Sequence, residues 1–230
     1  MSAPPFPALI FAAGFGTRMQ ALTADRPKPL IPVAGKPLID HALDLVWDAG
    51  CEPVVSNLHY RAEMLAEHLA PKGVQTVIEA PHILETGGGL RNAAQALQRS
   101  PVVTINSDAV WRGPNPIRLL QDAWDPKLMD ALLICIPPAR AVGHAGKGDF
   151  VRATNGQLRR GASSVYGGAQ IIKTDGLHEI SGQKFSLNVV WDKMLDQQRL
   201  YGVQYPGRWC DVGHPAGIQE AARLIEETDV

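Results

Sequence analysis

The sequence predicts an α/β fold in which a mainly parallel sheet is covered by helices on both faces. Short apolar runs alternate with helical patterns along most of the chain, and such alternation is typical of parallel sheets. The 230 residues are enough to bury a substantial core, in one large α/β domain or two small ones. A hydrophobic fraction of 45% and a charged fraction of 20% indicate an ordinary globular protein.

Short apolar runs bounded by turn residues are expected to form the strands of this sheet. The expected strands are 8–13, 53–58, 74–79, 101–106 and 131–136. Between them, apolar residues recur with helical spacing, and Gly50 is expected to end the first helix. The expected helices are 38–49, 62–69, 90–97 and 117–124.

From about Gly146 the pattern changes to shorter elements. Asn155-Gly156 between two arms predicts a β-hairpin within 148–161. A strand, a helix, a late strand, a turn and a closing helix are expected at 165–172, 187–198, 200–205, 209–213 and 215–227. We expect this C-terminal third to form a small α+β elaboration on one side of the sheet.

Composition excludes several classes of protein. A formal net charge of -1 argues against a surface that coats nucleic acid. The sequence contains no apolar run of the roughly 20 residues that cross a membrane, and its first residues lack the basic start of a signal peptide. Cys51, Cys135 and Cys210 are scattered and odd in number, which favours a reduced cytoplasm over a disulfide framework or a zinc site.

The strongest functional signal is the first glycine-rich loop, FAAGFGTRMQ. Gly14 and Gly16 follow a strand and allow a tight turn whose N–H groups can hold phosphate oxygens. Met19 stands where a dinucleotide-binding loop has its third glycine, and no P-loop G-K-[ST] follows. Arg18 can clamp a phosphate with its planar fork, and Lys28 lies between two prolines that stiffen the chain. The alternative is a plain turn with two solvated charges.

Two aspartates far apart in the chain are candidate metal ligands. Asp108 ends the strand-exit motif N-S-D, and Asp211 lies in W-C-D-V-G. Mg²⁺ that carries nucleotide phosphates takes one or two protein carboxylates and completes its shell with water and phosphate oxygens. Gly14, Gly87 and Asp108 all follow expected strands, so they should meet at the edge of the sheet where ligands bind. Either aspartate could instead be a turn or helix-cap residue.

Two further segments offer groups for a base and a sugar. The glycines of E-T-G-G-G, at 85–89, allow a flat base to lie against bare backbone. Asp149, in G-D-F, could accept hydrogen bonds from sugar hydroxyls. A flexible loop and a turn aspartate are the respective alternatives.

Together these motifs resemble a known family. A-A-G-F-G-T-R-M followed by R-P-K-P-L is similar to the signature loop of the sugar-1-phosphate nucleotidyltransferases, and the other motifs follow in the family's order along essentially the whole chain. The resemblance implies a Rossmann-like three-layer α/β/α nucleotidyltransferase fold with a mixed, mostly parallel sheet. It also implies one catalytic domain over 1–230, with a nucleotide-binding half to about 145 and a sugar-binding, closing half from about 146.

The resemblance also implies a reaction, in which a nucleotidyl group passes from a nucleoside triphosphate to a sugar-1-phosphate with Mg²⁺ as cofactor. Arg18 and Lys28 would be the catalytic cations, and Asp108 and Asp211 the metal ligands. The nucleotide-binding residues would be Ala12, Ala13, Gly14, Phe15, Gly16, Thr17, Glu85, Thr86, Gly87 and Gly88. The sugar-binding residues would be Asn106, Gly148 and Asp149.

Within that family, the motif set is most similar to members that use UTP and N-acetylmuramate 1-phosphate in bacterial peptidoglycan recycling. Glucose-1-phosphate and mannose-1-phosphate are the next candidate sugars. Ser107 stands where the family usually has glycine and is expected to crowd the backbone near the substrates. The sequence shows no clear counterpart of the glutamine with which many relatives read the base. We expect a cytoplasmic monomer or small homo-oligomer.

Three other classes of protein remain as alternatives. A nucleotide-sugar glycosyltransferase would carry a D-x-D metal motif, but Asn106 occupies its first position. A non-catalytic nucleotide sensor would not need both aspartates beside Lys28. An NAD-dependent enzyme is disfavoured by Met19 and by the absence of an acidic residue after the second strand, where Asn57 and His59 stand.

Overall fold

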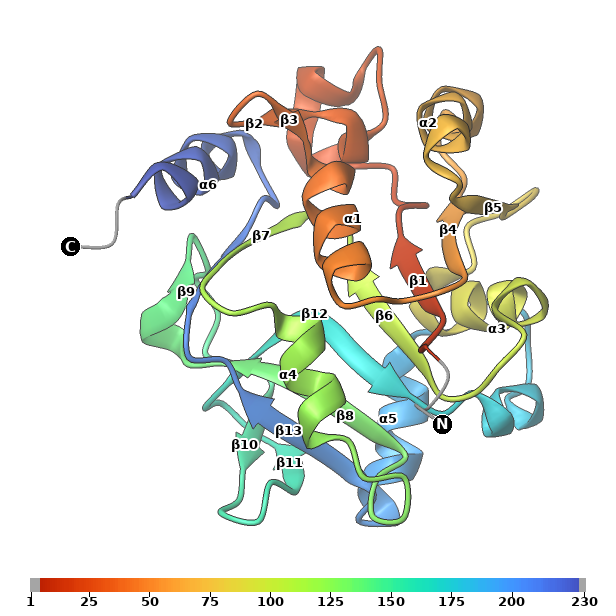
Figure 1. Ribbon diagram of the computed structural model, residues 1–230, viewed down its shortest axis with the longest axis vertical. Helices are drawn as coiled ribbons and strands as arrows, with labels where there is room; N and C mark the ends of the chain where they lie inside the picture. Colours follow the sequence, from red (N-terminus) through yellow and green to blue (C-terminus); the bar gives the residue numbers. More distant parts are fainter. Residues whose placement is uncertain (1–4, 228–230) are drawn as a thin grey trace.

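A seven-stranded sheet forms the centre of the protein in a computed structural model that describes residues 5–227. Its strands are β1 (Ala8–Phe11), β4 (Val54–Leu58), β5 (Gln75–Ile78), β6 (Val102–Asn106), β8 (Ala131–Ile136), β12 (Val165–Ile172) and β13 (Leu200–Gln204). They lie in the order β13-β8-β12-β6-β1-β4-β5 (Figure 1). Strand β12 runs antiparallel to both neighbours, whereas the other pairs are parallel. The predicted mixed, mostly parallel sheet is confirmed.

Helices cover both faces of this sheet. One face carries α1 (Leu38–Asp48), α2 (Ala62–Leu69) and α4 (Pro116–Ala123), and the other carries α3 (Glu85–Leu97) and α5 (Leu187–Asp196) (Figure 1). Side chains alternate between faces along each strand, so Leu9 and Ile10 of β1 enter different core clusters. Because strands such as β1 and β8 are buried on both faces, their sequences are continuous apolar runs.

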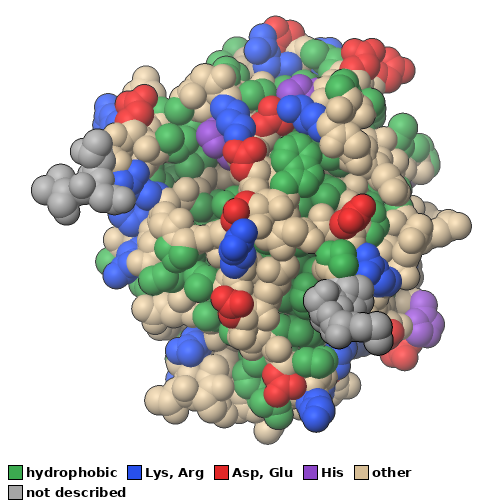
Figure 2. Space-filling view, viewed as in Figure 1, with side chains coloured by type: hydrophobic (Ala, Val, Ile, Leu, Met, Phe, Trp, Pro, Cys, Tyr) green, Lys and Arg blue, Asp and Glu red, His purple; other side chains and the backbone are tan. Residues whose placement is uncertain are grey.

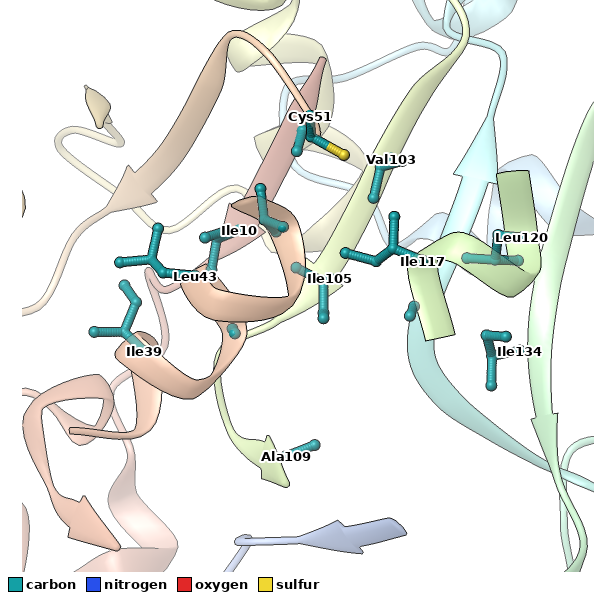
Figure 3. Packing of buried hydrophobic residues seen from close by; sticks show 14 of the residues in the cluster. Ile10, Ile39, Leu43, Cys51, Val103, Ile105, Ala109, Ile117, Leu120 and Ile134 are labelled. Atoms are coloured by element: carbon teal, nitrogen blue, oxygen red, sulfur yellow. The ribbon is translucent and has the colours of Figure 1, made fainter. Parts of the chain in front are cut away.

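The packing under α1 and α4 is shown in Figure 3. Ile39 and Leu43 of α1 and Ile117 of α4 reach the sheet residues Ile10 and Ile105. All five side chains are fully buried, and each such burial contributes about 1.5–3 kcal/mol. This core fixes the strand ends from which the candidate site is built.

A smaller layer lies beside the central sheet. It consists of the three-stranded sheet of β7 (Ala109–Arg112), β14 (Arg208–Asp211) and β9 (Ala141–Val142), covered by α6 (Pro215–Glu226). The remaining strands are β10 (Phe150–Arg152) paired with β11 (Leu158–Arg160), and β2 (Pro32–Val33) paired with β3 (Lys36–Pro37). Met19 is fully buried in the cluster beneath α6, so the residue that breaks the dinucleotide pattern anchors the first loop to this layer.

Most expected elements are confirmed, including the hairpin and the closing helix, but three expectations are wrong. Residues 209–211 are not a turn, because they form most of β14 and pair with β7 and β9. Gly87–Gly89 lie inside α3 and not in a loop. Strands β12 and β13 belong to the central sheet, so of the strands after Gly146 only β10, β11 and β14 lie outside it.

The charges of the protein are interspersed. Figure 2 shows acidic and basic side chains mixed over the face that it presents, without a stripe of one sign. Among residues 5–227, no helix has the length and the apolar character that a membrane span requires.

Candidate active site

A cavity of about 220 Å³ opens at the carboxyl ends of β1 and β6. Segments that are far apart in the sequence meet on its wall. The residues expected from the sequence that line it are Ala12, Ala13, Gly14, Lys28, Glu85, Thr86, Asn106 and Asp108. Ligands in open α/β sheets bind at this edge, and the predicted convergence of Gly14 and Asp108 is therefore observed.

A second cavity of about 300 Å³ adjoins the first. The two share Phe11, Thr86 and Asn106 as a common wall. Asp149 lines the second cavity, and its Oδ2 accepts a hydrogen bond from the backbone N–H of Tyr166 at 2.8 Å. The shared residues make the two cavities neighbouring parts of one cleft.

The first loop packs closely against the P-K-P segment, at the contact between Gly16 and Lys28. Gly16 has φ +66°, and a Cβ built on it would lie 2.9 Å from the Cβ of Lys28. Glycine is therefore required at this position for both backbone conformation and space. Phe15 is 45% exposed and packs edge-on against His59 at 5.1 Å between ring centroids. Neither Phe15 nor Thr17 lines either cavity.

Lys28 reaches into the cleft as a nearly buried cation. The residue is 8% exposed, and its Nζ lies 2.7 Å from Oδ2 of Asp108. Pro27 and Pro29 flank it, and Lys28 begins a short 3₁₀ turn that ends at Leu30. The restricted backbone lowers the entropy lost when the ammonium group is held against an anion.

The β7–β14 ladder pairs Asp211 with Ala109, and just beyond it the Val212 N–H donates to the Asp108 carbonyl at 2.9 Å. These contacts bring Asp211 next to Asp108. Burial and the negative charge of Asp108 raise the pKa of Asp211, while Lys28 and Arg18 act in the opposite direction. The Asp211 carboxylate has no hydrogen-bond or ion-pair partner among residues 5–227. The positive charges of Lys28 and Arg18 therefore do not offset the effects of burial and of Asp108 on this carboxylate.

The Arg18 side chain approaches Asp211 beside Gly213. A Cβ built on Gly213 would be 2.9 Å from Oδ2 of Asp211 and 3.3 Å from Nη1 of Arg18. Glycine at 213 thus leaves room for both side chains. The structure brings Arg18, Lys28, Asp108 and Asp211 together beside the first cavity. Lys28 and Asp108 line this cavity, whereas Asp211 and the exposed Arg18 do not.

The E-T-G-G-G glycines have a role different from the expected one. A Cβ on Gly87 would lie 2.5 Å from the Phe185 ring, and one on Gly88 would lie 2.3 Å from the Gln183 carbonyl oxygen. The bare backbone expected to receive a base is therefore covered by the segment before α5. Glu85 and Thr86 still line the first cavity, whereas Gly87 and Gly88 do not.

The structure adds Asn57 and Glu79, two site residues that the sequence analysis did not select. The Ala12 N–H donates to Oδ1 of Asn57 at 3.0 Å, and Nδ2 of Asn57 donates to Oε1 of Glu79 at 2.6 Å. The Leu84 N–H donates to Oε2 of Glu79 at 2.6 Å. Both side chains are buried and line the first cavity. Their sequence signal is a polar residue at the carboxyl end of each of two adjacent strands, β4 and β5.

The Ser107 hydroxyl is held by the backbone. It donates to the Phe11 carbonyl at 2.7 Å, and the residue is 4% exposed. The residue lines the first cavity, and its hydroxyl joins the ends of β6 and β1. Gly148, with φ +101°, packs against the Ser164 backbone and sets the start of the Asp149 turn.

Cations and paired carboxylates beside a two-part cleft are groups that suit an enzyme that binds phosphate anions. Residues 8–220 match the model of the MobA-like NTP transferase domain. The chain belongs to this family and is a sugar-1-phosphate nucleotidyltransferase. This excludes the glycosyltransferase, nucleotide-sensor and NAD-dependent alternatives.

Relatives match the chain over nearly its full length. It is 37% identical to the N-acetylmuramate alpha-1-phosphate uridylyltransferase of Caulobacter vibrioides, over 98% of this chain and 100% of that relative. It is 30% identical to the enzyme of the same name from Neisseria meningitidis serogroup B, over 94% and 97%. The solved inositol-1-phosphate CTP transferase of T. maritima matches with a TM-score of 0.78 over 100% of both chains at 14% identity. That match shows the shared fold.

Proposed function

We propose that this chain transfers the uridylyl group of UTP to N-acetylmuramate 1-phosphate and releases pyrophosphate. Two relatives that match it nearly end to end carry that activity in their names. The observation that carries the proposal is the charge cluster at the cleft mouth, where Lys28 and Asp108 pair at 2.7 Å beside Asp211. Such a cluster suits a reaction in which two phosphate anions must be held together.

The two cavities divide the substrates between them. The first, beside the glycine-rich loop, would hold the nucleotide, and the second, with Asp149, would hold the sugar. The shared wall of Phe11, Thr86 and Asn106 would bring the sugar phosphate next to the α-phosphate. Holding two reactants in line converts a bimolecular step into an effectively unimolecular one.

In the reaction, an oxygen of the sugar phosphate attacks the α-phosphorus. The bond to the β-phosphate oxygen breaks, and pyrophosphate leaves with the electron pair. The attacking phosphate is already ionised at neutral pH, so the chain supplies position and charge. Lys28 would hold the α-phosphate or the attacking phosphate, and Arg18 the departing phosphates, while the 14–17 backbone cradles the chain of phosphates. Preorganised charge of this kind is worth several kcal/mol in a transition state.

Mg²⁺ fits the donors at this place, and we propose Asp108 and Asp211 as its protein ligands. The raised pKa of Asp211, caused by burial and by Asp108, marks a pair of carboxylates that gains from a cation. Among residues 5–227, no group of three or more His, Cys, Asp or Glu side chains could hold a metal, so phosphate oxygens and water would complete the shell. When bound, Mg²⁺ would neutralise phosphate charge.

Glu79 supports UTP over CTP. An ionised carboxylate only accepts hydrogen bonds, and Glu79 lines the first cavity while Asn57 and the Leu84 N–H fix its position. Uracil presents N3–H as a donor, whereas N3 of cytosine is an acceptor that a carboxylate repels. We therefore propose Glu79 as part of the base-recognition wall.

The test is a substrate matrix that measures pyrophosphate release. The four ribonucleoside triphosphates are each combined with N-acetylmuramate, N-acetylglucosamine, glucose and mannose 1-phosphates in the presence of Mg²⁺. We expect the highest kcat/KM for UTP with N-acetylmuramate 1-phosphate. Higher efficiency with another pair would contradict this substrate assignment and leave the transferase class intact.

A further inference from the structure

Arg160, the last residue of β11, places a cation in the second cavity. It is the only Lys or Arg among the described residues that line this cavity. Lys28, the cation of the first cavity, lies on a different wall and is already engaged with Asp108. The second cavity therefore has a positive charge of its own, apart from the cluster proposed for the phosphates.

The Arg160 guanidinium is held in place by its surroundings. It lies over the Phe150 ring at 4.8 Å and over the Trp191 ring at 5.9 Å from each centroid. The Trp191 ring is itself fixed, because its Nε1–H donates to Oε1 of Gln170 at 2.9 Å. Stacking of this kind orients a planar guanidinium and lowers the entropy lost when it binds an anion.

Part of the guanidinium fork remains available. Nε and Nη2 donate to Oδ1 of Asp192 at 3.0 and 2.7 Å, and Nη1 makes no hydrogen bond to residues 5–227. The Asp192 side chain is 61% exposed and does not line the cavity. An exposed ion pair of this kind adds little stability. The pairing with Asp192 therefore does not explain why a stacked arginine lies in the wall of this cavity.

We propose that Arg160 determines sugar specificity by binding the lactyl carboxylate of N-acetylmuramate 1-phosphate. This inference rests on the proposed function. The substrate has two anionic ends, and the phosphate end belongs at the Lys28 cluster, so the carboxylate needs a second cation in the sugar cavity. Arg160 supplies a planar donor set that matches carboxylate geometry. Asp149 lines the same cavity as an acceptor and suits hydroxyl groups. N-acetylglucosamine 1-phosphate differs only in lacking the lactyl group and gains nothing from Arg160.

The experiment compares kcat/KM for N-acetylmuramate 1-phosphate and N-acetylglucosamine 1-phosphate, each with saturating UTP. Arg160→Gln removes the charge but keeps part of the stem that packs on Phe150. We expect it to lower the efficiency with the muramate substrate by about ten- to a hundredfold, and to leave the glucosamine substrate within about threefold. Arg160→Lys keeps a point charge and should retain part of the preference.

The matched control is Arg159→Gln. Arg159 is the exposed neighbour on the same strand, it lines neither cavity, and alternation along β11 places it on the opposite face of the hairpin. This control loses the same charge and should keep the wild-type preference. If the wild-type enzyme does not prefer the muramate substrate, the proposed function and this inference both fall. If it does and Arg160→Gln keeps that preference, or if Arg159→Gln abolishes it equally, only this inference is overturned.

Discussion

The two ends of the central sheet differ in how they hold a partly buried carboxylate. At the far end, where β12 ends and β8 begins, Asp130 accepts hydrogen bonds from Lys173 and Arg199, both at 2.7 Å. Burial works against the charge of Asp130, yet these two partners lower its pKa below the usual range. At the cleft end, Asp211 has no such partner among the described residues, and burial together with Asp108 raises its pKa.

The difference separates charges that stabilise the fold from charges kept for ligands. A carboxylate with two cationic partners contributes to stability in the ionised form. A buried carboxylate beside another carboxylate costs stability until a cation or a ligand arrives. Neutralising the aspartate at each end should therefore change stability with opposite signs, and only the change at the cleft end should lower activity.

The largest effect is expected from the cation of the cleft. Lys28→Met keeps the apolar stem that packs on Gly16 and removes the charge that faces the phosphates. We expect kcat to fall by roughly 10²–10³-fold, measured as pyrophosphate release, with the circular dichroism spectrum unchanged. The control is Lys36→Met, since Lys36 pairs with Asp44 away from both cavities. A kcat of Lys28→Met within threefold of wild type would contradict its assigned role.

The next effect tests the cleft carboxylates. Asp211→Asn should lower kcat/KM on the order of a hundredfold, because a proposed metal ligand is lost. The same change removes a poorly compensated buried charge, so we expect the Tm without ligands to rise by about 2–4 °C. Thermal unfolding and steady-state kinetics check the two parts. A lower Tm would show that Asp211 is a stabilising residue like Asp130, and the contrast between the two ends would disappear.

A smaller effect on turnover is expected from the loop beneath Lys28. Gly16→Ala places a methyl group 2.9 Å from the Lys28 Cβ and forces alanine into φ +66°. We expect kcat/KM to fall about tenfold through displacement of Lys28, with a loss of about 1–2 kcal/mol of stability. Gly35→Ala is the control, since Gly35 has a similar φ of +76°, a Cβ there meets no atom within 4 Å, and Gly35 lines neither cavity. Equal activity of the two variants would mean that Lys28 does not depend on this contact.

The smallest effect on activity is expected at the far end. Asp130→Asn should leave kcat and KM unchanged and cost about 1–2 kcal/mol of unfolding free energy in urea titrations at pH 7. Because the pKa of Asp130 is lowered in the fold, its contribution is present above the ordinary carboxyl pKa and is lost as pH falls below it. Wild type and variant should converge in stability at acidic pH. A constant difference across pH would exclude the ionised carboxylate as the cause.

Much of the fold could be predicted because the signals are local. Short stretches of consecutive residues are enough to show the apolar runs of β1, β6 and β8 and the helical period of α1. Phosphate binding by the first loop could be predicted in the same way, because Arg18 and the P-K-P segment lie close to its glycines in the sequence. The elements that were missed depend on distant partners. Residues 209–211 form a strand only because β7 and β9 lie on either side, and α3 takes in its glycines because Phe185 packs on them.

The site residues also divide into those with a local sequence signal and those that depend on distant partners. Asp108 could be selected because it leaves a buried strand, but Glu79 could not be connected with Asn57 until β5 was paired with β4. Arg160 gave no sequence signal at all, since it is one of two adjacent arginines on a short strand. Its place in the cavity depends on the pairing of β11 with β10 and on the packing of Trp191.

The sequence by itself determined the class of fold, the phosphate-binding loop and the two cations that it carries, because periodicity, glycine spacing and proline restraint act between near neighbours. Only the tertiary structure decided that Asp211 lies beside Asp108, that residues 183–185 cover Gly87 and Gly88, and that Arg160 lines the second cavity. These three facts depend on which charges and surfaces meet across about a hundred residues or on how a short hairpin packs, and such contacts are set by burial of the whole core.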